Sequence, residues 1–217
     1  MKIATWNLER PGKSSQKITS IIEHIASVNP DILVLTETND VIDLGNLYNS
    51  IHSSKAKEAF YKEGERRVSI YSKYKFLKEF ETFRNDTAIC VSLQTPMGEL
   101  TVYGTVIGIC GNREETFITD LDKQLADFGR LAEATNFCIS GDLNMTFSDN
   151  YYYTNEGRQK LNASFEKLNL VNLTADIPQN IDHIIITKSF VGNKPATIQN
   201  WNLNKKLSDH IGIAVTL

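Results

Sequence analysis

The sequence of 217 residues lacks the features that mark several special classes of protein. It has only five prolines and three cysteines, so neither a proline-rich linker nor a small disulfide-stapled domain fits it. No apolar run approaches the roughly 18 to 20 residues of a membrane-spanning helix. The first residues include Trp6, Asn7 and charged side chains where a signal peptide would have its apolar region. The net charge of −3 excludes a strongly cationic coat for nucleic acid.

The length and composition predict one globular domain covering residues 1–217, expected to be a monomer. A chain of this size buries roughly 70% of the surface that its unfolded form exposes, so it needs no disulfides to be stable. The cysteines, Cys90, Cys110 and Cys138, form no short pairing motif. Reduced thiols are typical of a reducing compartment, and we therefore expect the protein in the cytoplasm.

Short apolar runs predict more strands than helices. Strand-like runs occupy residues 1–6, 31–36, 68–72, 88–93, 100–109, 137–140, 181–187 and 211–217. Apolar residues at helical spacing occur in 18–25, 118–132 and 161–168. Hairpins as well as crossovers are needed to connect so many strands. The pattern favours sheets packed against each other with helices outside.

Polar residues stand at the ends of several of these strands. The positions are Asn7 and Glu9, Glu37, Asp142 and Asn144, Asp182 and His183, and the run Ser208-Asp209-His210. If the last two strands run antiparallel to the earlier ones, all five groups meet at one edge, where rigid scaffolds present catalytic side chains.

Such a cluster has a specific chemistry. Carboxylates with water suit Mg²⁺ or Mn²⁺, carboxamides hydrogen-bond anionic oxygens, and a His beside an Asp serves as a general acid or base. Together they suit hydrolysis of a phosphate ester. Taken singly, each group also has a plain structural reading, since Gly, Asp and Asn are common turn formers.

The order and spacing of the five groups resemble the endonuclease/exonuclease/phosphatase superfamily, which has the DNase I-like fold. The resemblance extends over the whole chain. It implies an α/β fold, a four-layer α/β sandwich with two mainly antiparallel sheets face to face and flanking helices. It also implies a metal-dependent phosphoric ester hydrolase that uses Mg²⁺, with Mn²⁺ as a substitute.

The resemblance also implies roles for single residues. Glu37 matches the principal metal ligand, helped by Asn7 and Asp209, and Glu9 falls where some members have a metal-proximal Asp. Asp142 and Asn144 match the pair that orients water and phosphate. Asp182 matches the partner of the catalytic histidine, His210. Either His210 or Asp142 could activate the water.

One position departs from the family pattern. The strand before the crossover usually presents a His or Tyr to the phosphate, and here Thr105 is expected in that place, with Tyr103 one side-chain repeat behind it. A Thr hydroxyl donates a hydrogen bond but is no strong acid.

The expectation for the substrate rests on residues 55–78, which contain eight Lys and Arg and three Glu among aromatic residues. This predicts a nuclease, whose Arg66, Arg67 and Lys73 follow a nucleic-acid backbone. An ordinary solvated face is the plain alternative for this segment. The alternative substrate is a small phosphorylated metabolite or lipid head group, and a catalytically dead binding module is a third reading. An AP endonuclease is disfavoured because Thr36-Glu37-Thr38-Asn39 lacks the Gln and Lys of the usual Gln-Glu-Thr-Lys.

Overall fold

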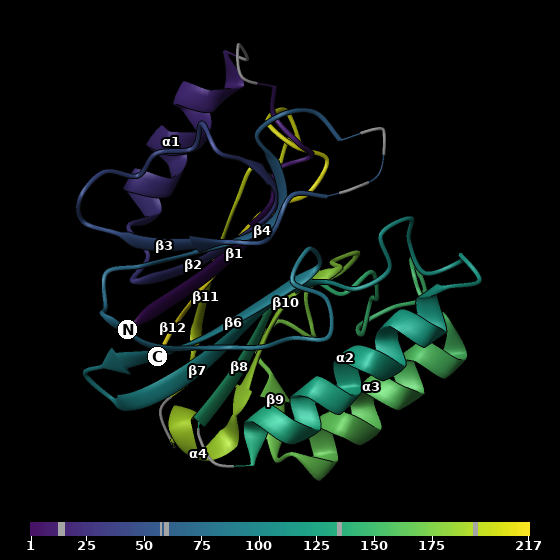
Figure 1. Cartoon of the computed structure of the whole chain (residues 1–217). Helices are drawn as coiled ribbons and strands as arrows, with labels where there is room; N and C mark the ends of the chain where they lie inside the picture. Colours follow the sequence, from purple (N-terminus) through teal and green to yellow (C-terminus); the bar gives the residue numbers. More distant parts are fainter. Residues whose placement is uncertain (13–15, 57, 59–60, 134–135, 193–194) are drawn as a thin grey trace.

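A computed structural model describes residues 1–12, 16–56, 58, 61–133, 136–192 and 195–217. Two six-stranded sheets lie face to face and carry helices on their outer sides (Figure 1). The first sheet has the order β11 (Thr197–Trp201), β12 (Gly212–Thr216), β1 (Lys2–Asn7), β2 (Ile32–Asn39), β4 (Glu65–Ser72) and β3 (Asn49–His52). The second has the order β5 (Phe76–Phe80), β6 (Ala88–Thr95), β7 (Gly98–Val106), β8 (Asn136–Asp142), β10 (Asp182–Thr187) and β9 (Leu170–Asn172).

Each sheet is mainly antiparallel, as expected. The parallel pairs are β1 with β2 in the first sheet and β7 with β8 in the second. Each of these two connections needs a crossover, and a helix supplies it: α1 (Lys17–Val28) between β1 and β2, and α2 (Phe117–Ala132) between β7 and β8. The remaining helices are α3 (Asn155–Lys167) and the short α4 (Lys188–Val191).

Three apolar clusters separate the four layers. Between the sheets lie side chains such as Ile3, Val34 and Ile184. Ile21 of α1 packs on the outer face of the first sheet, and Phe128 of α2 packs on the outer face of the second. The predicted α/β four-layer sandwich is confirmed. No helix within the described ranges is long and apolar enough to cross a membrane.

Gly104 of β7 lies in close contact with the opposite sheet. A Cβ at this position would lie 2.9 Å from Val68 Cγ1 and 3.2 Å from Val34 Cγ1, both on the opposite sheet. Only a residue without a side chain fits this contact.

Candidate active site

Alternation along three strands directs polar side chains into the space between the sheets. Ile3 of β1, Cys138 of β8 and Ile184 of β10 face this interior. Side chains two or four residues along a strand share a face, so Asn7, Asp142 and Asp182 continue the same three rows. Each apolar row therefore ends in a polar side chain at one edge of the sandwich.

A hydrogen bond joins the two sheets at this edge. The Asn7 amide donates from Nδ2 to Asp142 Oδ2 at 3.1 Å. The other carboxylate oxygen of Asp142 accepts from the backbone N of Asn144 at 2.8 Å. Asp142 also stands directly opposite Asp182 in the antiparallel pairing of β8 with β10. Two buried carboxylates thus lie side by side with an amide as their link to the first sheet.

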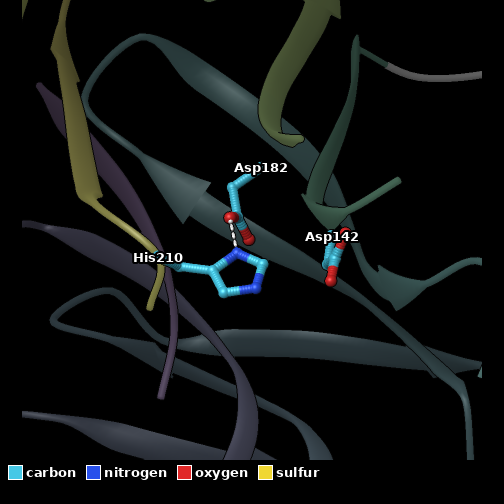
Figure 2. A group of neighbouring side chains, drawn as sticks. All are labelled: Asp142, Asp182 and His210. Atoms are coloured by element: carbon cyan, nitrogen blue, oxygen red, sulfur yellow. Dashed lines mark hydrogen bonds and ion pairs between the residues drawn. The ribbon is translucent and has the colours of Figure 1, made fainter. Parts of the chain in front are cut away.

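His210 completes the cluster from the loop before β12. Its Nδ1 lies 2.5 Å from Asp182 Oδ2, and this pair is drawn in Figure 2 with Asp142 beside the ring. Because Asp182 holds Nδ1, the other ring nitrogen, Nε2, faces the remaining polar groups. The Asp209 carboxylate lies 3.6 Å from Nε2 and is largely exposed. The expected His–Asp pair is present.

Three further residues fix the backbone that carries His210. The buried Asn202 donates from Nδ2 to the carbonyl oxygens of Ser208 and His210, at 2.8 and 2.7 Å. The Trp6 indole donates to the same His210 carbonyl at 3.2 Å. The Ser208 hydroxyl donates to the Asn7 carbonyl at 2.6 Å and accepts from the His210 N–H. Sequence reasoning gave no role to Asn202, and no motif points to it.

The charges of the cluster shift two pKa values. Burial of the imidazole disfavours its charged form, but the carboxylates of Asp182, Asp142 and Asp209 outweigh this and raise the pKa of His210 to about 10. Burial, reinforced by the neighbouring Asp182 carboxylate, raises the pKa of Asp142. Both pKa values are raised, and strongly perturbed pKa values in adjacent groups are typical of catalytic sites.

Glu37 lies near this cluster, at the end of β2. Its backbone is left-handed, with φ 45°, and the strand pairing passes from Thr36–Val68 to Thr38–Arg66 around it. Its charge contributes to the raised pKa of Asp142. Arg10 is bound to Glu37 twice, through its backbone N to the Glu37 carbonyl at 2.7 Å and through Nε to the carboxylate at 3.1 Å. Sequence reasoning did not foresee this arginine.

A close backbone contact and side-chain hydrogen bonds fix the end of β8 and the loop after it. Gly141 has φ +134°, and a Cβ there would lie 2.1 Å from the Thr105 carbonyl oxygen, so the glycine of the Gly-Asp-x-Asn motif is sterically required. The Asn144 side chain donates from Nδ2 to the carbonyl oxygens of Ile107 and Gly108, both at 3.0 Å. Its amide nitrogen therefore anchors the loop.

The expectation for Thr105 is wrong by one position. Thr105 and Tyr103 lie on the outer face of β7, where the Thr105 hydroxyl donates to Gln124 Oε1 of α2 at 2.5 Å and Tyr103 packs on Phe128. Val106 lies on the inner face and pairs with Asp142 across β7 and β8. An apolar side chain therefore stands nearest the site on this strand.

The expectations for the basic segment also fail. Arg67 has a fully buried side chain, paired with Glu58 and with Asp86, so it has no surface to offer a ligand. Arg66 is held by both carboxylate oxygens of Asp40, at 2.9 and 3.0 Å. Arg66 and Arg67 therefore have structural partners within the protein.

Lys73 follows the far end of β4. Ser72, its neighbour, pairs with Ile32 at the start of β2, whereas Glu37 stands near the end of β2. Its ammonium binds Asn29 Oδ1 at 2.7 Å. Lys73 therefore lies at the edge of the sheet opposite the site. Lys57, another cation of this segment, falls outside the described residues.

A cleft of about 400 Å³ opens beside His210. Asn144, Asp182 and Asp209 line it together with His210, and it extends to Tyr151, Tyr152 and Lys205. The cluster therefore borders a space that can take a ligand.

The match to a family model decides the class of protein. The model described as the endonuclease/exonuclease/phosphatase family matches residues 4–210. The chain belongs to this family. The family is named for enzymes that hydrolyse phosphoric esters, and the matched range contains every residue of the cluster. No curated protein sequence matches the chain.

Solved structures share the fold at low sequence identity. An AP endonuclease from Archaeoglobus fulgidus has a TM-score of 0.72 at 15% identity, covering 100% of this chain and 99% of that one. The catalytic domain of human Nocturnin with bound sulfate has a TM-score of 0.73 at 14% identity, with coverages of 99% and 92%. A 3′ phosphatase from Neisseria bound to a product DNA hairpin has a TM-score of 0.70 at 14% identity, with coverages of 100% and 99%.

The donor set at the site fits a hard divalent cation. Within the described part of the chain, Asp142, Asp182 and His210 form a group whose ligand atoms all lie within 4.8 Å of one another. The second Asp182 oxygen, Oδ1, is buried without a hydrogen-bond partner in the structure. With Glu37 and Asp209 nearby, the available ligands are mainly carboxylate oxygens, which Mg²⁺ and Mn²⁺ prefer.

Proposed function

We propose that this chain is a Mg²⁺- or Mn²⁺-dependent hydrolase of phosphodiester bonds and, more specifically, a nuclease. The observation that carries the proposal is the edge where Asn7 of one sheet meets Asp142, Asp182 and His210 in a single hydrogen-bonded cluster. These residues span more than 200 positions of sequence, and the fold brings them together with a cleft beside them.

In the proposed reaction a water oxygen forms a bond to phosphorus, the bond from phosphorus to the leaving oxygen breaks, and the leaving oxygen takes up a proton. Glu37, helped by Asn7 and Asp209, would hold Mg²⁺, which would neutralise charge at the phosphate. Asp182 holds the His210 ring so that Nε2 exchanges the proton at the cleft. Asn7 and Asp142 hold each other in place, and either Asp142 or His210 activates the water.

The choice of leaving group separates these two roles. If His210 protonates the leaving oxygen, His210→Ala should slow the hydrolysis of an alkyl phosphodiester far more than that of bis-p-nitrophenyl phosphate, whose leaving group needs no proton. If His210 activates water, both substrates should slow alike. Asp142→Asn serves as the comparison in the same assay.

The nuclease assignment now rests on different support. Arg66 and Lys73, which are paired, and Arg67, which is paired and buried, no longer favour it, whereas two similar structures are an AP endonuclease and a phosphatase bound to DNA. A substrate panel with Mg²⁺ tests it: plasmid, AP-site duplex, single strands, RNA, bis-p-nitrophenyl phosphate and inositol phosphates. Turnover of a small phosphate ester with no activity on any polynucleotide would select the alternative, a phosphatase or phosphodiesterase for a small metabolite or lipid head group.

A further inference from the structure

The cleft beside His210 extends on one side only. Its lining includes Asp209 and Asp182 but neither Glu37 nor Asn7, so it leads away from the ends of β1 and β2. A group bonded to a phosphate at His210 would occupy this space. The volume of about 400 Å³ lies at the lower end of the range for small-molecule sites, which favours one compact group over a long segment of duplex.

One wall of the cleft presents an exposed aromatic ring on a fixed loop. The Tyr151 side chain is 60% exposed. Its loop is nevertheless well held, because Asp149 accepts from the backbone N of Tyr151 at 2.9 Å and from that of Gln179 at 2.7 Å. Thr146 and Arg158 add bonds to the carbonyl of Asp149. The ring is exposed instead of packed in the core, and its fixed loop holds it at the cleft. A ring held in this way offers a surface on which a base can stack.

The lining of the cleft also includes a cation. Lys205 is exposed in the loop between β11 and β12, and among the residues that the structure describes no carboxylate pairs with it. Its backbone has φ 53°, and its N–H donates to the Asn202 carbonyl at 2.9 Å. Asn202 in turn binds the His210 carbonyl, so the position of Lys205 is tied to that of the catalytic histidine.

We infer that this cleft binds one nucleoside unit of the substrate, with its base on the Tyr151 ring and its further phosphate at Lys205. The inference rests on the proposed function, and it specifies the substrate class of that site. An aromatic base matches the exposed ring, and an anionic group matches the unpaired ammonium. The unit is either a free nucleotide or the end of a single strand, since both offer the same chemistry.

Calorimetry with phosphonate analogues measures binding in the cleft without turnover, because their P–C bond resists hydrolysis. The probes are the analogue of adenosine 5′-monophosphate, the matching ribose phosphonate without the base, and the adenosine analogue with a second phosphate at the 3′ position. Tyr151→Ala should weaken the adenosine analogue about five- to 150-fold, the effect of losing one stacked base, and leave the ribose analogue within about two-fold. Tyr151→Phe keeps the ring and should keep the affinity.

Lys205→Ala should weaken the two-phosphate analogue more than the one-phosphate analogue. Leu203→Ala and Lys206→Ala are matched controls, because both residues are exposed in the same loop but outside the cleft lining, and neither should change binding. A single-stranded hexanucleotide with phosphorothioate linkages separates the sources: tighter Tyr151-dependent binding than the free nucleotide indicates a strand end. Equal binding of adenosine and ribose analogues, or unchanged binding in Tyr151→Ala, would overturn the inference.

Failure of the proposed function would appear in a different assay. Absence of bis-p-nitrophenyl phosphate turnover with Mg²⁺ would refute the hydrolase, whatever the analogues do. Turnover that depends on His210, together with Tyr151-independent binding of every analogue, would keep the hydrolase and reject the nucleoside site.

Discussion

Acid should destabilise the protein through His183, a buried residue that supports the loop of the active site. His183 is fully buried on β10. Its Nε2 donates to the carbonyl of Met145 at 2.9 Å, directly after Asn144 in the chain. Its Nδ1 lies 3.0 Å from the Thr174 hydroxyl and 3.3 Å from the Asn172 amide nitrogen, both of which can donate to it. The surroundings therefore hold the neutral ring with its proton on Nε2.

The size of the effect follows from the pKa of this ring. Burial, the largest influence, lowers the pKa of His183 from 6.5 to about 4. Below pH 6.5 the unfolded chain binds a proton at His183, whereas the folded chain keeps the ring neutral. The free energy of unfolding therefore falls by about 1.4 kcal/mol per pH unit. The contribution of the neutral His183 ring to the free energy of unfolding is complete above about pH 6.5, and about 3 kcal/mol of it is lost when the pH reaches 4.

Urea unfolding followed by circular dichroism, at several values between pH 7.5 and 4, measures this loss. His183→Gln keeps a donor and an acceptor but does not titrate, so the difference between the two proteins isolates the contribution of His183 from that of the carboxylates. We expect the stability advantage of the native protein over the variant to shrink by about 3 kcal/mol across this range. Parallel pH profiles would refute the reasoning. So would an NMR titration of the native protein in which the His183 ring protonates near pH 6.5.

Three further predictions concern the site and its surroundings. His210→Ala should lower kcat by about 10² to 10⁴, and Asp182→Asn should add little in that background because the two act as one unit; fully multiplicative losses in the double variant would separate them. Glu37→Gln should weaken Mn²⁺ binding measured by electron paramagnetic resonance, and EDTA should abolish hydrolysis; full activity in EDTA would contradict a metal mechanism. Arg66→Ala and Lys73→Ala should leave the salt dependence of oligonucleotide binding unchanged, since both cations are paired; a slope reduced by about 0.9 for each variant would instead make them phosphate contacts.

Short periodic patterns in the sequence predicted packed sheets with helices outside and a cluster of polar strand ends, and the resemblance to the family added the four-layer sandwich. Asn7 and Asp142 end their strands and Asp182 begins β10, and each lies two or four residues along its strand from an inward apolar residue, so alternation directs all three inward. Their meeting also required the antiparallel course of β10 against β8, which the sequence could only suggest.

The errors arose where the face or the partner of a side chain had to be known. Thr105 is one residue away from Val106, and a shift of one position exchanges the two faces of a strand. Arg67 reads as a surface cation in the sequence, but its partner Asp86 lies 19 residues away and buries it. The role of Asn202 depends on a loop conformation that no short motif encodes.

The hydrogen bond from Asn7 to Asp142 gives the active site a property that neither sheet has alone. Asn7 belongs to the first sheet and Asp142 to the second, and Ser208 ties the carbonyl of Asn7 to the N–H of His210. The groups of the proposed site therefore keep their distances only while both sheets keep their packing. A cavity made between the sheets, as by Val34→Ala, should disturb the site through this link although Val34 touches none of its residues by hydrogen bonds. Loss of activity at temperatures where the variant stays folded, with Ile21→Val under α1 as the control outside the interface, is the result that this coupling predicts.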